Sequence, residues 1–362
     1  MSDAPILVMA GGTGGHVFPA LALATELIRR GKKVEWLGTS RGIESTLVPA
    51  AGINLNLIEV RGVRGKALID KLKAPLQIIL AVFSAIKLVS RLKPSLVIGF
   101  GGFASGPGGV AARVLGKPLI VHEQNAVAGT TNRLLAKTTP HRITAFPNVL
   151  VGGRCLGNPV REEIRSLASP WVRYQARTNQ LNLLVIGGSL GATFINKTVP
   201  AVLAGLHSDE SIFVRHQCGP EWKAETEDSY KSAKLPAAAS VEILPFIDDM
   251  ASAYSWADLV VCRAGAMTVS ELAAAGVASI LIPLPSAIDD HQTHNAEWLS
   301  DNRAAWLVPQ SSHTKDKITQ ILLQVVAERE QLLEMAERAR QQSYPDALSD
   351  LAELCEEVAN ER

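Results

Sequence analysis

A pattern of strand, glycine-rich turn and helix occurs twice in this chain, once near the start and once at the midpoint. The segment ILVMAGGTGGHVF, residues 6–18, aligns with NLLVIGGSLGATF, residues 182–194. In this alignment four turn residues of the first copy, Gly11, Gly12, Thr13 and Gly15, fall on Gly187, Gly188, Ser189 and Gly191. An apolar run, a bare turn and the start of a helix are typical of parallel α/β folds. The chain is therefore expected to contain two similar α/β domains.

Short apolar runs alternate with helical patterns along the whole chain, as a doubly wound parallel sheet requires. We expect strands at residues 6–10, 33–37, 54–60, 95–100, 118–122 and 142–146 in the first half. In the second half we expect them at residues 181–186, 211–217, 241–245, 258–262, 279–283 and 304–308. The segment VGGRCLGNPVREEI between the halves indicates a hinge. Two such domains would place their ligand sites at the carboxyl ends of the strands, in a cleft between them.

Composition limits the class of protein. The chain has 362 residues, of which 47% are hydrophobic and 20% charged, and its net charge is +1. These values favour a soluble protein of about two domains and give no general attraction to nucleic acid. The four cysteines have neither metal-ligand nor disulfide spacing, and no segment resembles a signal peptide or a membrane span. We expect a cytosolic protein.

The loop GGTGGH after the first apolar run has two interpretations. Its glycines allow a ligand such as a phosphate to approach the backbone, or they only make a tight turn. The spacing does not fit the dinucleotide fingerprint, and no P-loop motif occurs, so NAD and ATP are disfavoured. The loops GFGGFASGPGG and VHEQNAVAGTTNR also each follow an expected strand. Together the three loops indicate a surface suited to a diphosphate.

Two stretches of the second half carry polar groups after expected strands. In VCRAGAMTVSELAAAG, Glu271 can accept both ribose hydroxyls or merely interact with the helix dipole. In PSAIDDHQTHNAEW, His291 and His294 share a helix face, but a third ligand at metal spacing is lacking. No Asp-x-Asp motif is present, so a leaving diphosphate would be met by the Gly188-Ser189 turn.

One helical segment is apolar on two sides and basic at its start. Within RGVRGKALIDKLKAPLQIILAVFSAIKLVSRLK, one expected buried stripe comprises Ile78, Val82, Ile86 and Val89. A second side carries Leu76, Ile79, Leu80 and Phe83, close to Lys71 and Lys73. Such a helix is either deeply buried or rests on an anionic membrane surface.

In their order, these motifs resemble the MurG family, the enzymes that add N-acetylglucosamine to lipid I in peptidoglycan synthesis. The similarity includes GGTGGH, GTSRGIE, GGFASGPGG, HEQN, GNPVR, GGSLGA, FIDDM, CRAGAMTVSE and DDHQTHNAE. It implies a GT-B glycosyltransferase with two Rossmann-like domains: residues 1–158 for the acceptor and membrane, residues 159–340 for UDP-N-acetylglucosamine, and a final helix, residues 341–362, that crosses back. Phe103 stands where relatives often carry Tyr, and Leu190 where Gln is frequent.

The resemblance implies an inverting transfer of N-acetylglucosamine from its UDP donor to the muramyl 4-hydroxyl of lipid I, which gives lipid II. It implies no metal or other cofactor. The implied partners are lipid I, the anionic cytoplasmic face of the bacterial inner membrane, to which the protein would bind peripherally, and other cell-wall synthesis and division proteins. No nucleic acid is implied.

The implied site residues fall into four groups. His16 is the candidate base or else holds the acceptor or its loop, with His122 and Glu123 in reserve. Donor binding is expected from Thr13, Gly14, Gly15, Asn125, Arg161, Ser189, Ile247, Ala266, Met267, Thr268, Val269, Ser270, Glu271 and Gln292. Acceptor binding is expected from Gly11, Gly12, Gly101, Gly102, Ser105 and Gly106. Membrane contact is expected from Leu76, Ile79, Leu80, Phe83, Lys71 and Lys73.

Two other functions are compatible with parts of this pattern. A GT-B relative such as a UDP-N-acetylglucosamine 2-epimerase would need acid–base carboxylates and no lipid acceptor. A membrane-docked scaffold would not need Glu271, Gln292 and His16. The ordered motifs and the basic, apolar helix favour the transferase.

Overall fold

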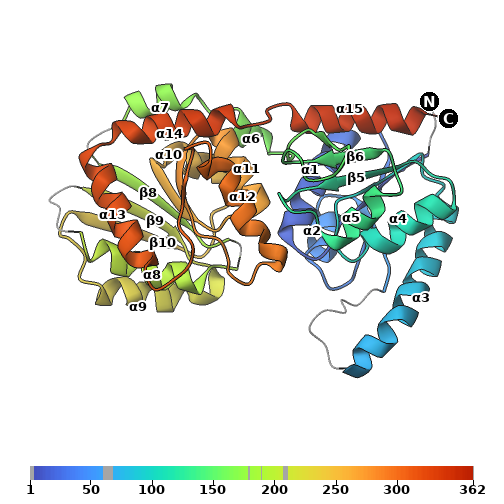
Figure 1. Ribbon diagram of the computed structural model, residues 1–362, viewed down its shortest axis with the longest axis horizontal. Coiled ribbons are helices and arrows are strands. Elements are labelled where there is room, and N and C mark those ends of the chain that lie inside the picture. The colour runs from blue at the N-terminus through green and yellow to red at the C-terminus, as the bar shows by residue number, and fades with distance from the viewer. Residues whose placement is uncertain (1–3, 60–67, 178–179, 189, 207–210, 362) are drawn as a thin grey trace. The chain divides into compact units, whose positions relative to one another are not determined.

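The computed structural model describes residues 4–59, 68–177, 180–188, 190–206 and 211–361, with side chains of the third helix from residue 76 onward. Contacts divide the chain into two compact units, one of Met1–Val160 with Tyr344–Arg362 and one of Arg161–Ser343. Each unit is a parallel sheet with helices packed against it (Figure 1). The expected α/β class is confirmed.

The first unit contains a sheet in the order β3-β2-β1-β4-β5-β6-β7. Its strands are β1 (Ile6–Met9), β2 (Val34–Gly38), β3 (Asn54–Leu57), β4 (Leu96–Gly99), β5 (Leu119–Glu123), β6 (His141–Thr144) and β7 (Arg154–Cys155). Its helices are α1 (Gly14–Arg29), α2 (Glu44–Ala50), α3 (Leu68–Leu92), α4 (Ser105–Val114), α5 (Thr130–Ala136) and α15 (Ala347–Asn360). Alternate residues of β1 belong to two different cores, Ile6 and Val8 to one and Leu7 and Met9 to the other. This alternation buries both faces of the sheet.

The second unit has the sheet order β10-β9-β8-β11-β12-β13, which repeats the order of the first unit without a counterpart of β7. Its strands are β8 (Leu181–Ile186), β9 (Ile212–Gln217), β10 (Ala239–Leu244), β11 (Leu259–Cys262), β12 (Ala278–Leu281) and β13 (Trp306–Leu307). Its helices are α6 (Glu162–Arg165), α7 (Pro170–Gln175), α8 (Thr193–Leu203), η1 (Pro220–Trp222), α9 (Lys223–Ser232), α10 (Met250–Trp256), α11 (Ala266–Ala275), η2 (Ile288–Asp290), α12 (His291–Ser300), α13 (Thr314–Ala327) and α14 (Glu330–Gln341). Strands β1 and β8 occupy equivalent central places, as the sequence repeat predicts.

All twelve expected strands are present, with ends displaced by a few residues. The expected hinge segment contains the boundary between the two units, after Val160, but it also contains a strand that was not expected. Arg154–Cys155 forms the edge strand β7, paired in parallel with β6. Two residues among glycines, asparagine and proline carry too little pattern to be recognised as a strand.

The C-terminal helix α15 belongs to the first unit, although the chain passes through the whole second unit before it. Its apolar face, including Leu351 and Cys355, joins the core that contains Leu23 and Leu27 of α1. Arg30 reaches the same helix, with Nη2 donating to Ser349 Oγ at 3.0 Å.

Helix α3 is only partly buried, which contradicts the expected buried stripe at Ile78. Its buried residues in the part with described side chains are Ala81, Ala85, Leu88 and Val89, whereas Ile78 is 47% exposed. Four apolar side chains are also exposed: Leu76, Ile79, Leu80 and Phe83. The interpretation of α3 as deeply buried along its length is therefore wrong.

Candidate active site

The first glycine-rich loop ends β1 and begins α1. Gly12 has φ +93°, a conformation that favours glycine, and its N–H donates to Glu44 Oε2 at 2.9 Å. Thr13 is the N-cap of α1, and its Oγ1 lies 3.4 Å from His16 Nδ1. His16 is half-buried in the first turn of the helix. Its position is compatible with the expected role of a base.

The second glycine-rich loop packs against the first. A Cβ on Gly102 would lie 2.2 Å from the Gly11 carbonyl oxygen, and a Cβ on Gly101 would lie 3.1 Å from the His16 ring. Ser105 is fully buried, and its Oγ accepts from the Gly101 N–H at 3.1 Å. The amides of Gly12 and Gly101 are thus bonded inside the unit, so these two do not point to an acceptor diphosphate as expected. A Cβ on Gly106 would only touch Thr131, at 3.5 Å.

His122 is completely buried and stacked on Phe100, with ring centroids 5.0 Å apart. Its Nε2 contacts the Gly157 carbonyl at 3.1 Å and its Nδ1 contacts Gln124 Nε2 at 2.8 Å. Burial lowers the pKa of His122 to about 4, against the opposing effect of the Gly157 carbonyl. His122 is therefore neutral near pH 7 and fits a structural role better than that of a reserve base.

Glu123 anchors the third loop. Its Oε1 accepts from the Asn125 N–H at 3.0 Å, and its Oε2 accepts from the Gly129 N–H at 3.0 Å and from Asn132 Nδ2 at 2.9 Å. The side chain is 1% exposed. Because both oxygens already accept hydrogen bonds from this loop, the carboxylate orients Asn125 and fits a structural role better than that of a reserve base.

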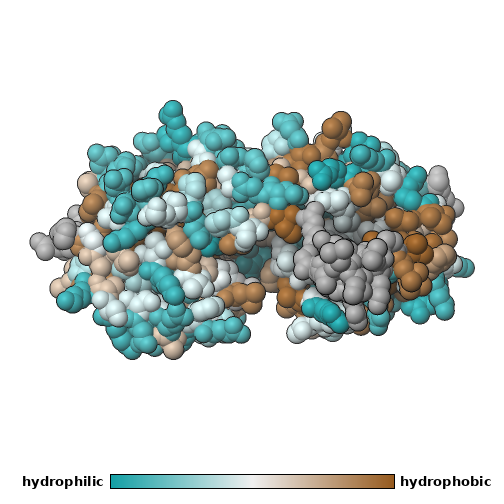
Figure 2. Space-filling view, turned by 60° about the horizontal axis from the view of Figure 1, so that its bottom comes forward, coloured by the Kyte–Doolittle hydropathy of each residue, from teal (hydrophilic) through white to brown (hydrophobic). Residues whose placement is uncertain are grey.

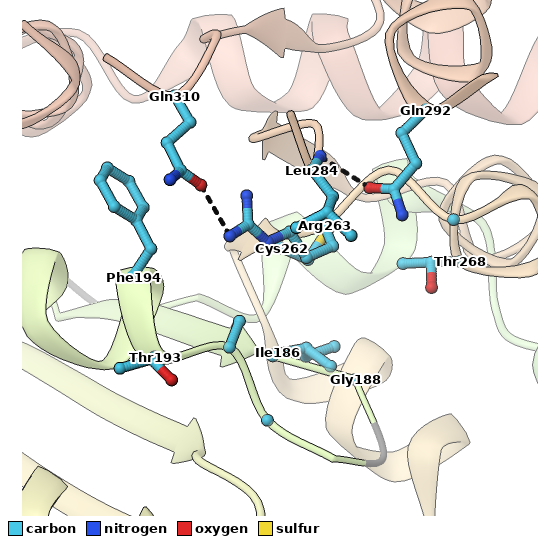
Figure 3. A pocket seen from close by; sticks show the side chains of 14 residues that line it. Ile186, Gly188, Thr193, Phe194, Cys262, Arg263, Thr268, Leu284, Gln292 and Gln310 are labelled. Atoms are coloured by element: carbon cyan, nitrogen blue, oxygen red, sulfur yellow. Dashed lines mark hydrogen bonds between the residues drawn. The ribbon is translucent and has the colours of Figure 1, made fainter. Parts of the chain in front are cut away.

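The second unit contains a cavity of about 620 Å³ at the carboxyl ends of β8 and β11. Glycines of the repeat's turn, Gly187, Gly188 and Gly191, line it together with Thr268 and Gln292. Figure 3 shows Arg263 and Gln310 on another side, with Arg263 Nη2 donating to Gln310 Oε1 at 2.8 Å. The Arg263 guanidinium lies over the aromatic ring of Phe194, with Cζ 5.8 Å from the ring centroid. A bare turn, a cation and two amides are groups that suit an anionic, hydroxyl-rich ligand.

Gln217, at the end of β9, links two loops of this unit. Its Nε2 donates to the Gly188 carbonyl at 2.9 Å, and its Oε1 accepts from the Ile247 N–H at 3.1 Å. The expected uracil contact at Ile247 and the expected diphosphate turn are thus tied by one amide side chain. Ser189 itself lies outside the described residues.

Glu271 lies on α11 with two partners. Arg161 Nη2 donates to its Oε1 and Tyr254 Oη donates to its Oε2, both at 3.1 Å. Burial raises the pKa of Glu271, opposed by Arg161 and by the Tyr254 hydroxyl. Its side chain is 14% exposed.

Helical periodicity separates the expected nucleotide contacts of α11. Ala266, Val269 and Ser270 are buried, while Met267, Thr268 and Glu271 are half-buried on another face. A side-chain role in binding therefore fits only the second group. Gln292 Oε1 accepts from the Leu284 N–H at 3.0 Å, which holds its amide at the cavity (Figure 3).

The two histidines of α12 are engaged separately. His291 Nδ1 contacts the Ile288 carbonyl at 2.7 Å, and His294 Nδ1 contacts Glu297 Oε2 at 2.8 Å. Within the described part of the chain, no group of three or more His, Cys, Asp or Glu side chains is placed to hold a metal ion.

Comparison with known proteins identifies the family. Residues 6–143 match the glycosyltransferase family 28 N-terminal domain and residues 182–351 match the family 28 C-terminal domain. A protein of Cellvibrio japonicus named UDP-N-acetylglucosamine–N-acetylmuramyl-(pentapeptide) pyrophosphoryl-undecaprenol N-acetylglucosamine transferase is 53% identical, over 99% of this chain and 100% of its own. The chain belongs to the MurG family of glycosyltransferases. A solved structure of MurG from Acinetobacter baumannii is 43% identical, covers 98% of this chain and 99% of its own, and superimposes with a TM-score of 0.86.

Another relative of this MurG-family chain is similar in sequence, and a more distant one shares only the fold. An identically named transferase of Pseudomonas savastanoi is 50% identical, over 99% of both chains. The kitacinnamycin glycosyltransferase structure is only 16% identical, with a TM-score of 0.73 over 99% of this chain and 100% of its own, and shows that the fold is shared.

Four side chains of the site were not predicted from the sequence: Phe194, Gln217, Arg263 and Gln310. Arg263 directly follows β11 within CRAGAMTVSE, so its place at the carboxyl end of a strand was a usable signal. Gln310 lies 47 residues further along the chain than Arg263, and no local pattern connects the two.

Proposed function

We propose that this enzyme transfers N-acetylglucosamine from UDP-N-acetylglucosamine to N-acetylmuramyl-(pentapeptide) pyrophosphoryl-undecaprenol, or lipid I, and forms lipid II. The observation that carries the proposal is identity of 53% over nearly the whole chain with a transferase named for this donor and acceptor. The cavity of the second unit is lined by groups that suit a sugar nucleotide, and Glu271 lies one helical turn along α11 from the lining residue Thr268.

The donor is assigned to the second unit. Glu271 accepts the ribose hydroxyls, and the turn that includes Gly188 and Ser189 meets the diphosphate through backbone N–H groups. Ile247 contacts the uracil and Gln292 contacts the sugar. Arg161, which already holds Glu271, orients that carboxylate for the ribose.

The reaction inverts the configuration at the anomeric carbon. The muramyl 4-hydroxyl attacks this carbon, the new carbon–oxygen bond forms as the bond to the UDP oxygen breaks, and the hydroxyl proton passes to His16. The leaving diphosphate is stabilised by backbone donors and by Arg263 rather than by a divalent cation, because the chain has no Asp-x-Asp motif to hold one. We therefore expect the reaction to survive a chelator.

The enzyme binds the cytoplasmic face of the membrane peripherally through α3. Among the described residues no helix has the length and apolar character to cross a bilayer. Leu76, Ile79, Leu80 and Phe83 are each at least half exposed, and Figure 2 shows hydrophobic surface gathered on this part of the first unit. Lys71 and Lys73 belong to the same helix, but their side chains lie outside the described ones.

The experiment is UDP release from UDP-N-acetylglucosamine, with and without a lipid I analogue, in the presence of a chelator throughout. Release that requires the lipid and tolerates the chelator supports the metal-independent transferase. Release without lipid would indicate a hydrolase or an epimerase-like enzyme instead. Binding of UDP without any turnover would favour a scaffold.

A further inference from the structure

Glu44 is a buried carboxylate with no assigned role. It is the first residue of α2, its exposed fraction is 0%, and it lies beneath the first glycine-rich loop. Its Oε2 accepts from the Gly12 N–H at 2.9 Å. Its Oε1 accepts from both groups of Thr39, the N–H at 3.0 Å and the Oγ1–H at 2.8 Å. Three donors and no basic partner among the described contacts make it an acceptor for loop backbone rather than a member of an ion pair.

The same carboxylate accounts for three glycines in two separate motifs. A Cβ on Gly11 would lie 2.5 Å from Glu44 Oε1, one on Gly38 would lie 2.8 Å from Glu44 Cγ, and one on Gly42 would lie 1.9 Å from Glu44 Oε2. Side chains at these positions would displace the carboxylate. The glycines of GGTGGH and GTSRG therefore make room for Glu44 as well as for any ligand.

The hydrogen bond between Glu44 and the Gly12 N–H lies in the same loop as His16, the proposed base. Gly12 turns the chain with φ +93° into Thr13, the N-cap of α1, and the Thr13 carbonyl accepts from the His16 N–H at 3.1 Å. The Gly11 carbonyl, on the other side of Gly12, lies against Gly102 of the second glycine-rich loop. Fixing the Gly12 amide thus fixes the start of α1 and the contact between the two loops.

We propose that Glu44 is a positioning residue that sets the loop of residues 11–16 and, through it, the place of the His16 ring. The proposal rests on the function proposed above for the reaction. Glu44 does not touch substrate, because it is enclosed and its oxygens are occupied.

Glu44→Gln tests this role with little change of size. A glutamine presents one oxygen and one NH2 group, so it cannot accept from Gly12 and from Thr39 at the same time. We expect kcat with the lipid I analogue to fall about 10- to 100-fold, as a displaced catalytic group does. The Kd for UDP, whose proposed site is in the second unit, should change by less than about twofold, the scale of the differences expected at distant, independent sites.

Glu35→Gln is the matched control. Glu35 is also in the first unit, on β2, but its carboxylate accepts from the side chains of Asn54 and Asn56, at 2.8 and 2.7 Å, and from no glycine-rich loop. It should retain wild-type kcat. Thr39→Val, which removes one donor and keeps the carboxylate, should have an intermediate kcat and serves if Glu44→Gln does not fold.

Amide hydrogen exchange of the peptide over residues 10–18 gives a second readout that needs no turnover. Faster exchange there in Glu44→Gln, and not in Glu35→Gln, supports the proposal even if the assigned reaction is wrong. Unchanged exchange and unchanged kcat in both Glu44→Gln and Thr39→Val would overturn it. A wild-type protein without lipid-dependent turnover would contradict the proposed function alone.

Discussion

At the scale of single residues, Glu271 is the side chain on which donor binding is expected to depend. In the proposed assignment, Glu271→Gln removes the charge that would accept the ribose hydroxyls, and hydrogen bonds to a charged group contribute about 1.5–3 kcal/mol. We expect the Kd for UDP to rise about 10- to 100-fold, measured by calorimetry. Glu242→Gln is the control, because Glu242 is a carboxylate of the same unit whose side chain is 43% exposed and pairs with Arg215 at 2.8 Å. Equal Kd values for Glu271→Gln and wild type would show that Glu271 does not contribute to UDP binding.

The pH dependence of UDP binding follows from the same carboxylate. Burial raises the pKa of Glu271, so its charge is lost at a higher pH than for an ordinary glutamate. As the pH falls, UDP affinity should therefore begin to weaken at a higher pH than an ordinary glutamate would cause. Glu271→Gln should bind weakly and lose the part of this dependence that the carboxylate contributes, because the terminal phosphate of UDP also titrates at acidic pH. Kd values of wild type and Glu271→Gln that vary with pH in parallel would contradict this assignment.

A substitution of His16 distinguishes the two roles considered for this residue, that of the base and that of a group that holds the acceptor or the loop. If His16 takes the proton, His16→Ala should lower kcat about 100- to 10,000-fold and leave the Kd for UDP unchanged. If its ring only holds the acceptor or the loop, the KM for the lipid I analogue should rise with a smaller loss of kcat. Steady-state kinetics against both substrates distinguish these outcomes.

At the scale of elements, α3 is the helix expected to touch the membrane. Leu80 is 57% exposed, and burial of a leucine in an apolar phase is worth about 1.5–3 kcal/mol. Leu80→Ser should therefore weaken binding to vesicles that contain anionic lipid about tenfold or more, measured by sedimentation. Leu323→Ser is the control, since Leu323 is 45% exposed on α13 of the second unit. Equal vesicle binding by the two variants would exclude this face of α3.

Helices and strands were also the features of the structure that could best be predicted from the sequence. Strands such as β1 and β8 could be predicted because a buried parallel strand is a short apolar run beside a glycine turn. The two-residue β7 could not, because its residues lack such a run. Ile78 was expected inside because its spacing fits one helix face, but the helix extends beyond the surface it packs on, so spacing alone did not show where burial ends.

Side-chain networks were less predictable than elements. Glu44 lies 32 positions from Gly12, and Gln217 lies 30 positions from Ile247, so neither bond leaves a local pattern. His16 and Glu271 could be selected because they stand within recognisable motifs, GGTGGH and CRAGAMTVSE. The partners that orient such residues come from other strands, and only the folded sheet brings them together.

At the scale of the whole molecule, each unit contains one deeply buried histidine among its described residues, His122 in the first and His216 in the second. Burial lowers the pKa of His122 to about 4 and that of His216 to about 3. In the unfolded chain both titrate near pH 6.5, so between about pH 6.5 and 4 the unfolded state binds more protons than the folded state. Stability should therefore fall as the pH falls, by up to about 1.4 kcal/mol per pH unit for each histidine.

Urea unfolding at pH 7.5 and at pH 5.5, followed by circular dichroism, measures this effect. His122→Gln should reduce the dependence on pH in addition to lowering stability. Replacement of the exposed His313 by Gln should leave the dependence as it is in the wild type. A free energy of unfolding equal at both pH values would show that neither buried histidine is protonated on unfolding.

In the proposed reaction the sugar itself is transferred to the lipid. The direct measurement is incubation of the wild-type enzyme with UDP-N-acetylglucosamine labelled in the sugar and a lipid I analogue, in chelator, followed by mass and anomeric analysis of the lipid. We predict one added N-acetylglucosamine in β linkage at the muramyl 4-position, with an equal amount of UDP. Label that remains in UDP-sugar as a 2-epimer, or that appears as free N-acetylglucosamine, would contradict the assignment.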